Sequence, residues 1–193
     1  MQNEWIACSK ANVECSGSID DKEELDNIVF GGAHEITIYI DEPVQFHTHT
    51  TYGEGNLVDK MSPPSGADYL SLIQSHVIEY VVAEKGIWII EKIKPVPSEL
   101  KVAVDVYFQM LKYRFVNGDY GEEDEKELAS RYSLMVNEMS PKALFDEVDE
   151  DYMKYMDDQL DRTYRCGCSV SDLSKFAQRL EDERYYSIKY ISL

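Results

Sequence analysis

The stretch Ile36-Thr37-Ile38-Tyr39-Ile40-Asp41-Glu42-Pro43-Val44-Gln45-Phe46-His47-Thr48-His49 indicates a β-sheet. β-Branched and aromatic residues fill Ile36–Ile40, a composition typical of a buried strand. Asp41-Glu42-Pro43 is a tight turn, and Val44–His49 is the next strand. The sequence therefore predicts successive strands in the front half of the chain, and one of them carries two histidines.

The sequence on either side predicts further strands and also helices. Additional strands are expected at Val13–Ile19, Ile28–Phe30, Ile78–Val82 and Ile87–Ile93, of which the last two form a β-hairpin. Ser65 follows two prolines and is a suitable N-cap for a helix, and Glu99–Val116 has helical periodicity. Thr50–Pro64 combines glycines, paired prolines and mixed charges, and is expected to form an exposed loop. This mixture of elements favours the α/β class.

The chain becomes acidic and helix-rich after Gly118. The run Gly121-Glu122-Glu123-Asp124-Glu125-Lys126-Glu127 opens this part, and no Gly/Ser-rich linker precedes it. We therefore predict a main domain over residues 1–118 and an acidic helical extension over residues 119–193, packed on that domain. The carboxylates of the extension would suit a basic protein partner.

Composition excludes some classes of function. The 193 residues carry a formal net charge of −18, with a pI of about 4.5. This charge argues against nucleic acid, because binding to phosphates requires clustered Lys and Arg. The sequence contains no apolar run long enough to cross a bilayer and no N-terminal signal sequence, so no membrane association is expected.

The cysteines point to a reducing compartment. The chain has four of them, at Cys8, Cys15, Cys166 and Cys168. Cys166 and Cys168 are too close in sequence to form a comfortable disulfide, and the chain has no N-glycosylation sequon. The expected location is therefore intracellular, either cytoplasmic or nuclear.

Three side chains form a candidate zinc site. His47 and His49 are one residue apart on a strand, so their rings lie on the same face. Asp68 lies in the first turn of the helix that Ser65 caps, where its carboxylate can reach the same space. Two histidines, one carboxylate and a water molecule are typical of an open, catalytic zinc site.

A zinc hydrolase also needs a general base, and two glutamates are candidates. Glu35 lies on the neighbouring strand, immediately before the histidine strand, and Glu14 lies on an earlier strand that a compact sheet could bring alongside it. Either carboxylate could take a proton from water and pass it to the leaving amine. Spacing in the sequence does not choose between them.

The order of these segments resembles the JAMM motif of the MPN (JAB1/MPN/Mov34) metalloprotease family. Glu14-Cys15-Ser16-Gly17 is similar to the glutamate segment of that family, and Phe46-His47-Thr48-His49 is similar to its paired-histidine strand. Pro64-Ser65-Gly66-Ala67-Asp68 is similar to its Ser-x-x-Asp segment. The resemblance covers Val13–Lys94 and does not extend to the acidic region.

The resemblance implies a fold and a site. The fold would be a mixed β-sheet flanked by helices, related to the cytidine-deaminase architecture, and Zn²⁺ would be the cofactor. His47, His49 and Asp68 would bind the metal, Glu14 would be the general base and acid, and Ser65 would donate to the developing oxyanion.

The resemblance also implies a substrate. It would be a conjugate of ubiquitin or a ubiquitin-like protein, cleaved at its isopeptide or peptide bond. A non-catalytic MPN-type scaffold module, or a hydrolase of another amide, are the alternative functions.

The sequence departs from the family pattern at three points. Thr50–Pro64 is longer than the usual connection between the second histidine and the serine, and we expect this loop to shape substrate binding. Thr50 replaces a common proline, and the stretch from Glu14 to His47 is shorter than usual.

Overall fold

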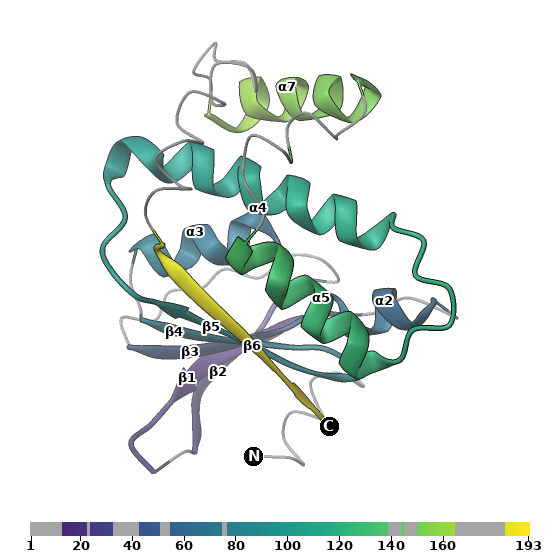
Figure 1. Cartoon of the computed structure of the whole chain (residues 1–193). Helices are drawn as coiled ribbons and strands as arrows, with labels where there is room; N and C mark the ends of the chain where they lie inside the picture. Colours follow the sequence, from purple (N-terminus) through teal and green to yellow (C-terminus); the bar gives the residue numbers. More distant parts are fainter. Residues whose placement is uncertain are drawn as a thin grey trace.

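The computed structural model describes residues 13–22, 24–32, 43–50, 55–74, 77–138, 144, 150–164 and 184–193. These residues form a mixed α/β fold in which a six-stranded sheet carries helices (Figure 1). The predicted strand at 36–40 and the candidate base Glu35 lie outside the described residues, as do Cys8, Cys166 and Cys168.

The described sheet contains one parallel pair of strands. Its members are β1 (Cys15–Ile19), β2 (Leu25–Phe30), β3 (Val44–Thr48), β4 (Ile78–Val82), β5 (Gly86–Lys92) and β6 (Tyr186–Ser192). They lie in the order β2-β1-β3-β4-β5-β6, with β3 parallel to β4 and all other neighbours antiparallel. The sheet is therefore mixed, and β3, the histidine strand, lies inside it.

The connection between β3 and β4 contains two helices, α2 (Leu57–Met61) and α3 (Gly66–Gln74). Two parallel strands require such a crossover, because a tight turn can join only antiparallel neighbours. The prediction that Thr50–Pro64 is simply an exposed loop is wrong over α2, which buries Val58 and Met61. The sequence signal for α2 is a capping box between Asn56 and Asp59.

Helix α4 lies over α3 and completes a stack on the sheet (Figure 1). It spans Lys101–Val116 and follows a short 3₁₀ turn, η1 (Ser98–Leu100). The contact with α3 is close, because a Cβ atom at Gly66 would lie 2.0 Å from the carbonyl oxygen of Asp105. Glycine at position 66 therefore allows the start of α3, with its Ser-x-x-Asp segment, to lie directly against α4.

The acidic region contributes both helices and a strand. Helices α5 (Glu125–Glu138) and α7 (Glu150–Tyr164) agree with the expected helical character, and α7 lies beyond α4 (Figure 1). The sequence analysis did not predict β6, which pairs with β5. Because of β6, residues on both sides of position 118 belong to one sheet.

The core lies between the sheet and these helices. Trp88 of β5, Tyr132 of α5 and Phe115 of α4 are fully buried, and their rings meet edge to face at centroid distances of 4.9 and 5.0 Å. Tyr186 of β6 donates a hydrogen bond from its hydroxyl to the carbonyl oxygen of Tyr69 in α3. None of the described helices is long and apolar enough to cross a membrane.

Candidate metal centre

Strand β3 places both candidate histidines against the start of α3. His47 lies in β3 and His49 one residue beyond its end, and the two rings lie on the same face with centroids 4.9 Å apart. The histidine Nε2 atoms are 3.0 Å apart. Asp68, in the first turn of α3, adds its carboxylate at 3.2 Å from His47 Nε2 and 3.5 Å from His49 Nε2. The structure thus brings together all three predicted metal ligands.

The spacing of these atoms fits a tetrahedral zinc ion. Zinc–nitrogen and zinc–oxygen bonds of about 2.0–2.1 Å place two tetrahedral ligand atoms about 3.3 Å apart. The two Nε2 atoms lie 3.0 Å apart, Asp68 Oδ1 lies 3.2 Å from His47 Nε2, and the other carboxylate oxygen, Oδ2, lies 3.5 Å from His49 Nε2, so each distance is close to that value. All three residues are largely shielded from solvent, with His47 at 3% and Asp68 at 8% exposure. The group therefore matches a metal site in donor type and in geometry, while the identity of the metal rests on donor preference.

The other nitrogen of each ring has an acceptor of its own. His47 Nδ1 lies 2.6 Å from Glu79 Oε1, and His49 Nδ1 lies 3.1 Å from the carbonyl oxygen of Ser62. A carbonyl oxygen only accepts, so this contact is a hydrogen bond when His49 carries its proton on Nδ1, whereas the Ser62 hydroxyl, 3.2 Å from the same nitrogen, can pair with either form of the ring. A carboxylate places the His47 proton in the same way. In the neutral form of each ring, Nε2 lies toward Asp68 and carries the lone pair that a metal would bind.

Glu79 is a site residue that the sequence analysis missed. It belongs to β4, opposite Gln45 in the β3–β4 register, and is fully buried. Its second oxygen lies 2.5 Å from the Ser71 hydroxyl, which also lies 2.6 Å from the carbonyl oxygen of Asp68. The available signal was a single charged residue inside the otherwise apolar strand Ile78–Val82, because such a residue is buried only with a partner.

Opposing charges set the protonation of the metal-free cluster. Burial lowers the pKa of His47, but the carboxylates of Asp68 and Glu79 outweigh it and raise that pKa to about 10. Burial raises the pKa of Asp68, but His47 and His49 hold it well below its ordinary value. Burial also lowers the pKa of His49. Without metal, His47 is therefore protonated, and its positive charge compensates the carboxylates of Asp68 and Glu79 as a bound cation would.

Glu14 lies beside this cluster by strand register. Ser16 of β1 is opposite His47 of β3, and continuing the antiparallel register by two residues places Glu14 opposite His49. The charges of Glu14 and Asp68 both act on Lys112 of α4. The role of Glu14 as the base stays a prediction. The competing candidate, Glu35, lies outside the described residues.

Lys112 is a second residue that sequence reasoning missed. It is half-buried on α4, and burial lowers its pKa while Asp68 and Glu14 raise it. Its charge also contributes to the lowered pKa of His49. A lone lysine in a long helix gives no local signal, because its position depends on how α4 packs on α3.

Ser65 closes the first turn of α3 onto Asp68. Its backbone N–H and its hydroxyl both donate to Asp68 Oδ2, at 2.5 and 2.9 Å. Ser65 therefore holds the Asp68 carboxylate in place, and its predicted contact with an oxyanion stays a prediction.

Comparison with known proteins adds no assignment: no protein-family model, curated protein or solved structure matches the chain.

Proposed function

We propose that the chain is a zinc-dependent hydrolase that cleaves isopeptide or peptide bonds, with conjugates of ubiquitin or a ubiquitin-like protein as the substrate class. One observation carries the proposal: the Nε2 atoms of His47 and His49 lie 3.0 Å apart, and each has an oxygen of the Asp68 carboxylate within 3.5 Å. Zinc in such a site polarises a carbonyl and lowers the pKa of a water molecule toward neutrality. The resemblance to JAMM metalloproteases supports the choice of substrate.

Glu14 is the general base and acid in this proposal. Hydrolysis adds water across the amide C–N bond: the water oxygen bonds to the carbonyl carbon, and the amine leaves with a proton. A carboxylate opposite His49 can accept the proton as the water attacks and then deliver it to the leaving nitrogen. The charge of Glu14 acts to raise the pKa of Lys112 on α4, which places the two side chains within electrostatic range of each other.

Ser65 would donate to the carbonyl oxygen as negative charge develops on it. The hydroxyl has one proton, and it now donates that proton to Asp68 Oδ2. Asp68 Oδ2 keeps the Ser65 backbone N–H when the hydroxyl turns away, so Asp68 is not left without a donor. A donor of this kind contributes about 3 kcal/mol to the transition state in comparable sites.

The test is a pair of matched substitutions in the β1–β2 hairpin. Glu14→Gln should keep one zinc per chain and reduce hydrolysis of diubiquitin and ubiquitin-like fusion substrates at least 100-fold, because the amide accepts no proton. Glu24→Gln, at an exposed position in the same hairpin, should leave the zinc content and the rate of hydrolysis unchanged. Full activity in Glu14→Gln would reject Glu14 as the base. A zinc-loaded wild type that cleaves none of the substrates would instead favour the scaffold module.

A further inference from the structure

Strand β6 is the outer edge of the described sheet, and half of its backbone groups face away from β5. The Ile93 N–H donates to the Tyr185 carbonyl and the Leu193 N–H to the Lys85 carbonyl, so odd-numbered residues of β6 pair with β5. The N–H and C=O groups of Ile188, Tyr190 and Ser192 therefore point outward. Among the described residues, no backbone partner lies on that side of these three.

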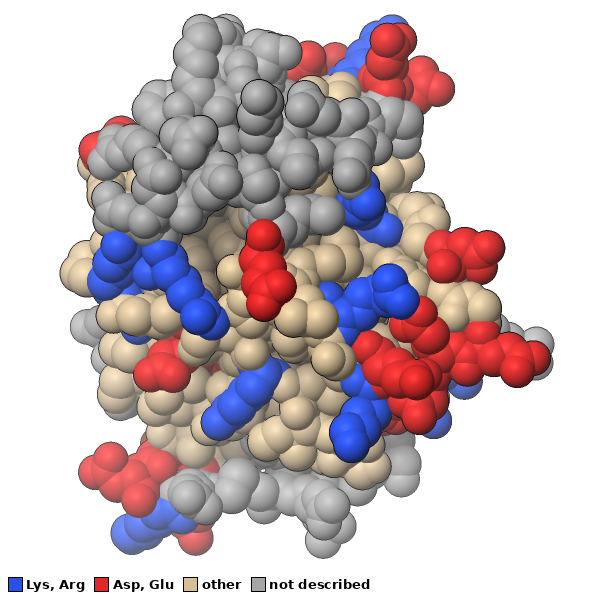
Figure 2. Space-filling view, viewed as in Figure 1, with Lys and Arg blue, Asp and Glu red and all other residues tan. Residues whose placement is uncertain are grey.

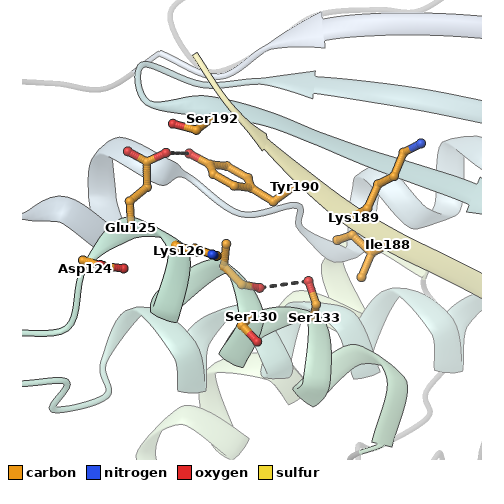
Figure 3. A pocket seen from close by; sticks show the side chains of 10 residues that line it. Asp124, Glu125, Lys126, Ser130, Ser133, Ile188, Lys189, Tyr190 and Ser192 are labelled. Atoms are coloured by element: carbon orange, nitrogen blue, oxygen red, sulfur yellow. Dashed lines mark hydrogen bonds between the residues drawn. The ribbon is translucent and has the colours of Figure 1, made fainter.

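A groove of about 730 Å³ lies beside these outward groups, between β6 and α5 (Figure 3). Its lining comes from the first turns of α5 and the second half of β6: Asp124, Glu125, Lys126, Ala129, Ser130, Ser133, Ile188, Lys189, Tyr190 and Ser192. The side chains that α5 contributes at Ala129, Ser130 and Ser133 are small, Ala129 and Ile188 are buried where α5 packs on β6, and the groove lies along this contact. The volume is within the range of about 300–1,000 Å³ found for ligand sites.

The groove is one in which a further strand would fit. Each of Ile188, Tyr190 and Ser192 offers one donor and one acceptor along the edge. An extended peptide that pairs with them gains backbone hydrogen bonds, and its alternate side chains enter the groove beside α5. None of the lining residues belongs to the metal cluster, so this surface is separate from the proposed hydrolase site.

Charge at one end of the groove selects the partner. Asp124 and Glu125 line it together with Lys126 and Lys189, and the Tyr190 hydroxyl of β6 donates to Glu125 Oε1. The adjoining segment Asp119–Glu127 is strongly acidic, with six carboxylates and one lysine. Figure 2 shows acidic side chains gathered beside the start of α5, at the right of the view. The net charge of −18 opposes pairing of β6 with a second copy of the chain and attracts basic segments.

We propose that the groove between α5 and β6 binds an extended, lysine- or arginine-containing segment of a partner protein, which adds to β6 as a further strand. The backbone edge supplies most of the attraction, and the carboxylates at the start of α5 select basic side chains. This interaction is independent of hydrolysis at the metal centre.

The first test uses a fluorescent eight-residue peptide of alternating Lys and Val. It should bind the full chain saturably, and more weakly as salt rises. The same peptide with N-methylated amides along one edge should bind at least tenfold more weakly, because it cannot donate to β6. Replacing Lys by Glu should also abolish binding. In hydrogen exchange, the peptide should slow the amides of Ile188, Tyr190 and Ser192.

Two substitutions on α5 test the location. Ser130→Trp fills the groove from an exposed position and should weaken peptide binding at least tenfold. Leu134→Trp adds the same ring at an exposed position on the same helix, outside the lining, and should leave binding unchanged. Unchanged zinc binding and thermal unfolding would show that both variants are folded.

Several results would overturn the proposal. One is the absence of saturable binding by the Lys–Val peptide, and another is equal binding of the N-methylated peptide. Equal binding by the Glu peptide would reject the charge selection. Concentration-dependent dimerisation of the chain that Ser130→Trp abolishes would show that the occupant is a second copy.

Discussion

The contact of strand β3 with helix α3 and the contact of strand β6 with helix α5 differ in how the space between strand and helix is filled. Between β3 and α3, the space is filled by buried titratable groups, and His47, Asp68 and Glu79 each have close polar partners. Between β6 and α5, small side chains such as Ala129 and Ser133 leave a groove. A buried charged side chain needs hydrogen-bond or ion-pair partners within the folded chain. The outward backbone groups of an edge strand can instead bond to water until another strand pairs with them. The inner pair is therefore suited to hold an ion, and the outer pair to accept a chain.

Zinc binding should have the largest effect, and it should act on the β3–α3 region and not on the β6–α5 region. At a concentration about 1,000 times its Kd, zinc should raise the free energy of unfolding by about 4 kcal/mol. Because its ligands lie at β3 and α3, hydrogen exchange should slow there and stay unchanged at the outward amides of β6. Thermal unfolding and hydrogen exchange with and without zinc test this. If zinc does not slow hydrogen exchange in β3, these residues do not bind the metal. If it slows exchange equally in β3 and in β6, the two regions are coupled.

Glu79→Gln should weaken zinc binding 10- to 100-fold while leaving the three ligands in place. The amide cannot match a carboxylate in orienting His47 and in strengthening its ring as a ligand. Competition titration with a chromophoric chelator measures the affinity. Glu91→Gln, on the solvent-exposed part of β5, is the matched control and should bind zinc like the wild type. Equal zinc affinity in Glu79→Gln and Glu91→Gln would show that Glu79 does not contribute to zinc binding.

The metal-free protein should lose stability as pH rises above neutrality. The pKa of His47 is about 10 in the folded chain, against an ordinary value of 6.5. Its stabilisation is thus fully present below pH 6.5 and is lost as pH rises toward 10. We expect the free energy of unfolding, measured in urea, to fall steadily between pH 6.5 and 9.5. Zinc should stabilise more as pH rises, because binding displaces that proton. If the free energy of unfolding of the metal-free protein does not change with pH over this range, His47 is not charged in the folded chain.

Lys112→Met should have the smallest effect and increase zinc affinity. The substitution removes a positive charge that acts on Asp68 and His49, so a cation is repelled less. A roughly two- to fivefold gain is expected for a partly exposed charge. Lys126→Met, at an exposed position lining the outer groove, should leave zinc affinity unchanged. Weaker binding in Lys112→Met would show that this lysine positions the ligands instead.

The sequence was informative where the signal is local. His47 and His49 share a face because strand side chains alternate, and Asp68 follows from the predicted start of a helix. Glu79 was missed because its contact with His47 depends on the parallel register of β3 and β4, which no short motif encodes. Lys112 depends in the same way on the packing of α4 against α3.

The outer region was harder to predict for a different reason. The run Tyr185–Ser192 alternates aromatic or β-branched residues with Ser and Lys, which is a strand signal, but it follows a long acidic, helix-rich part of the chain. Its pairing with β5 joins segments about a hundred residues apart. The short helix α2 was missed because glycines and prolines around it indicated a loop, although Asn56 and Asp59 form its capping box.

The most direct test of the metal centre is the zinc content of the purified protein beside that of His47→Ala. We expect about one zinc per chain in the wild type after reconstitution at neutral pH, and none in the variant. Thermal unfolding of both metal-free proteins shows whether the variant is folded. A wild type that binds no zinc under these conditions, or a folded His47→Ala protein that retains it, would rule out the metal centre.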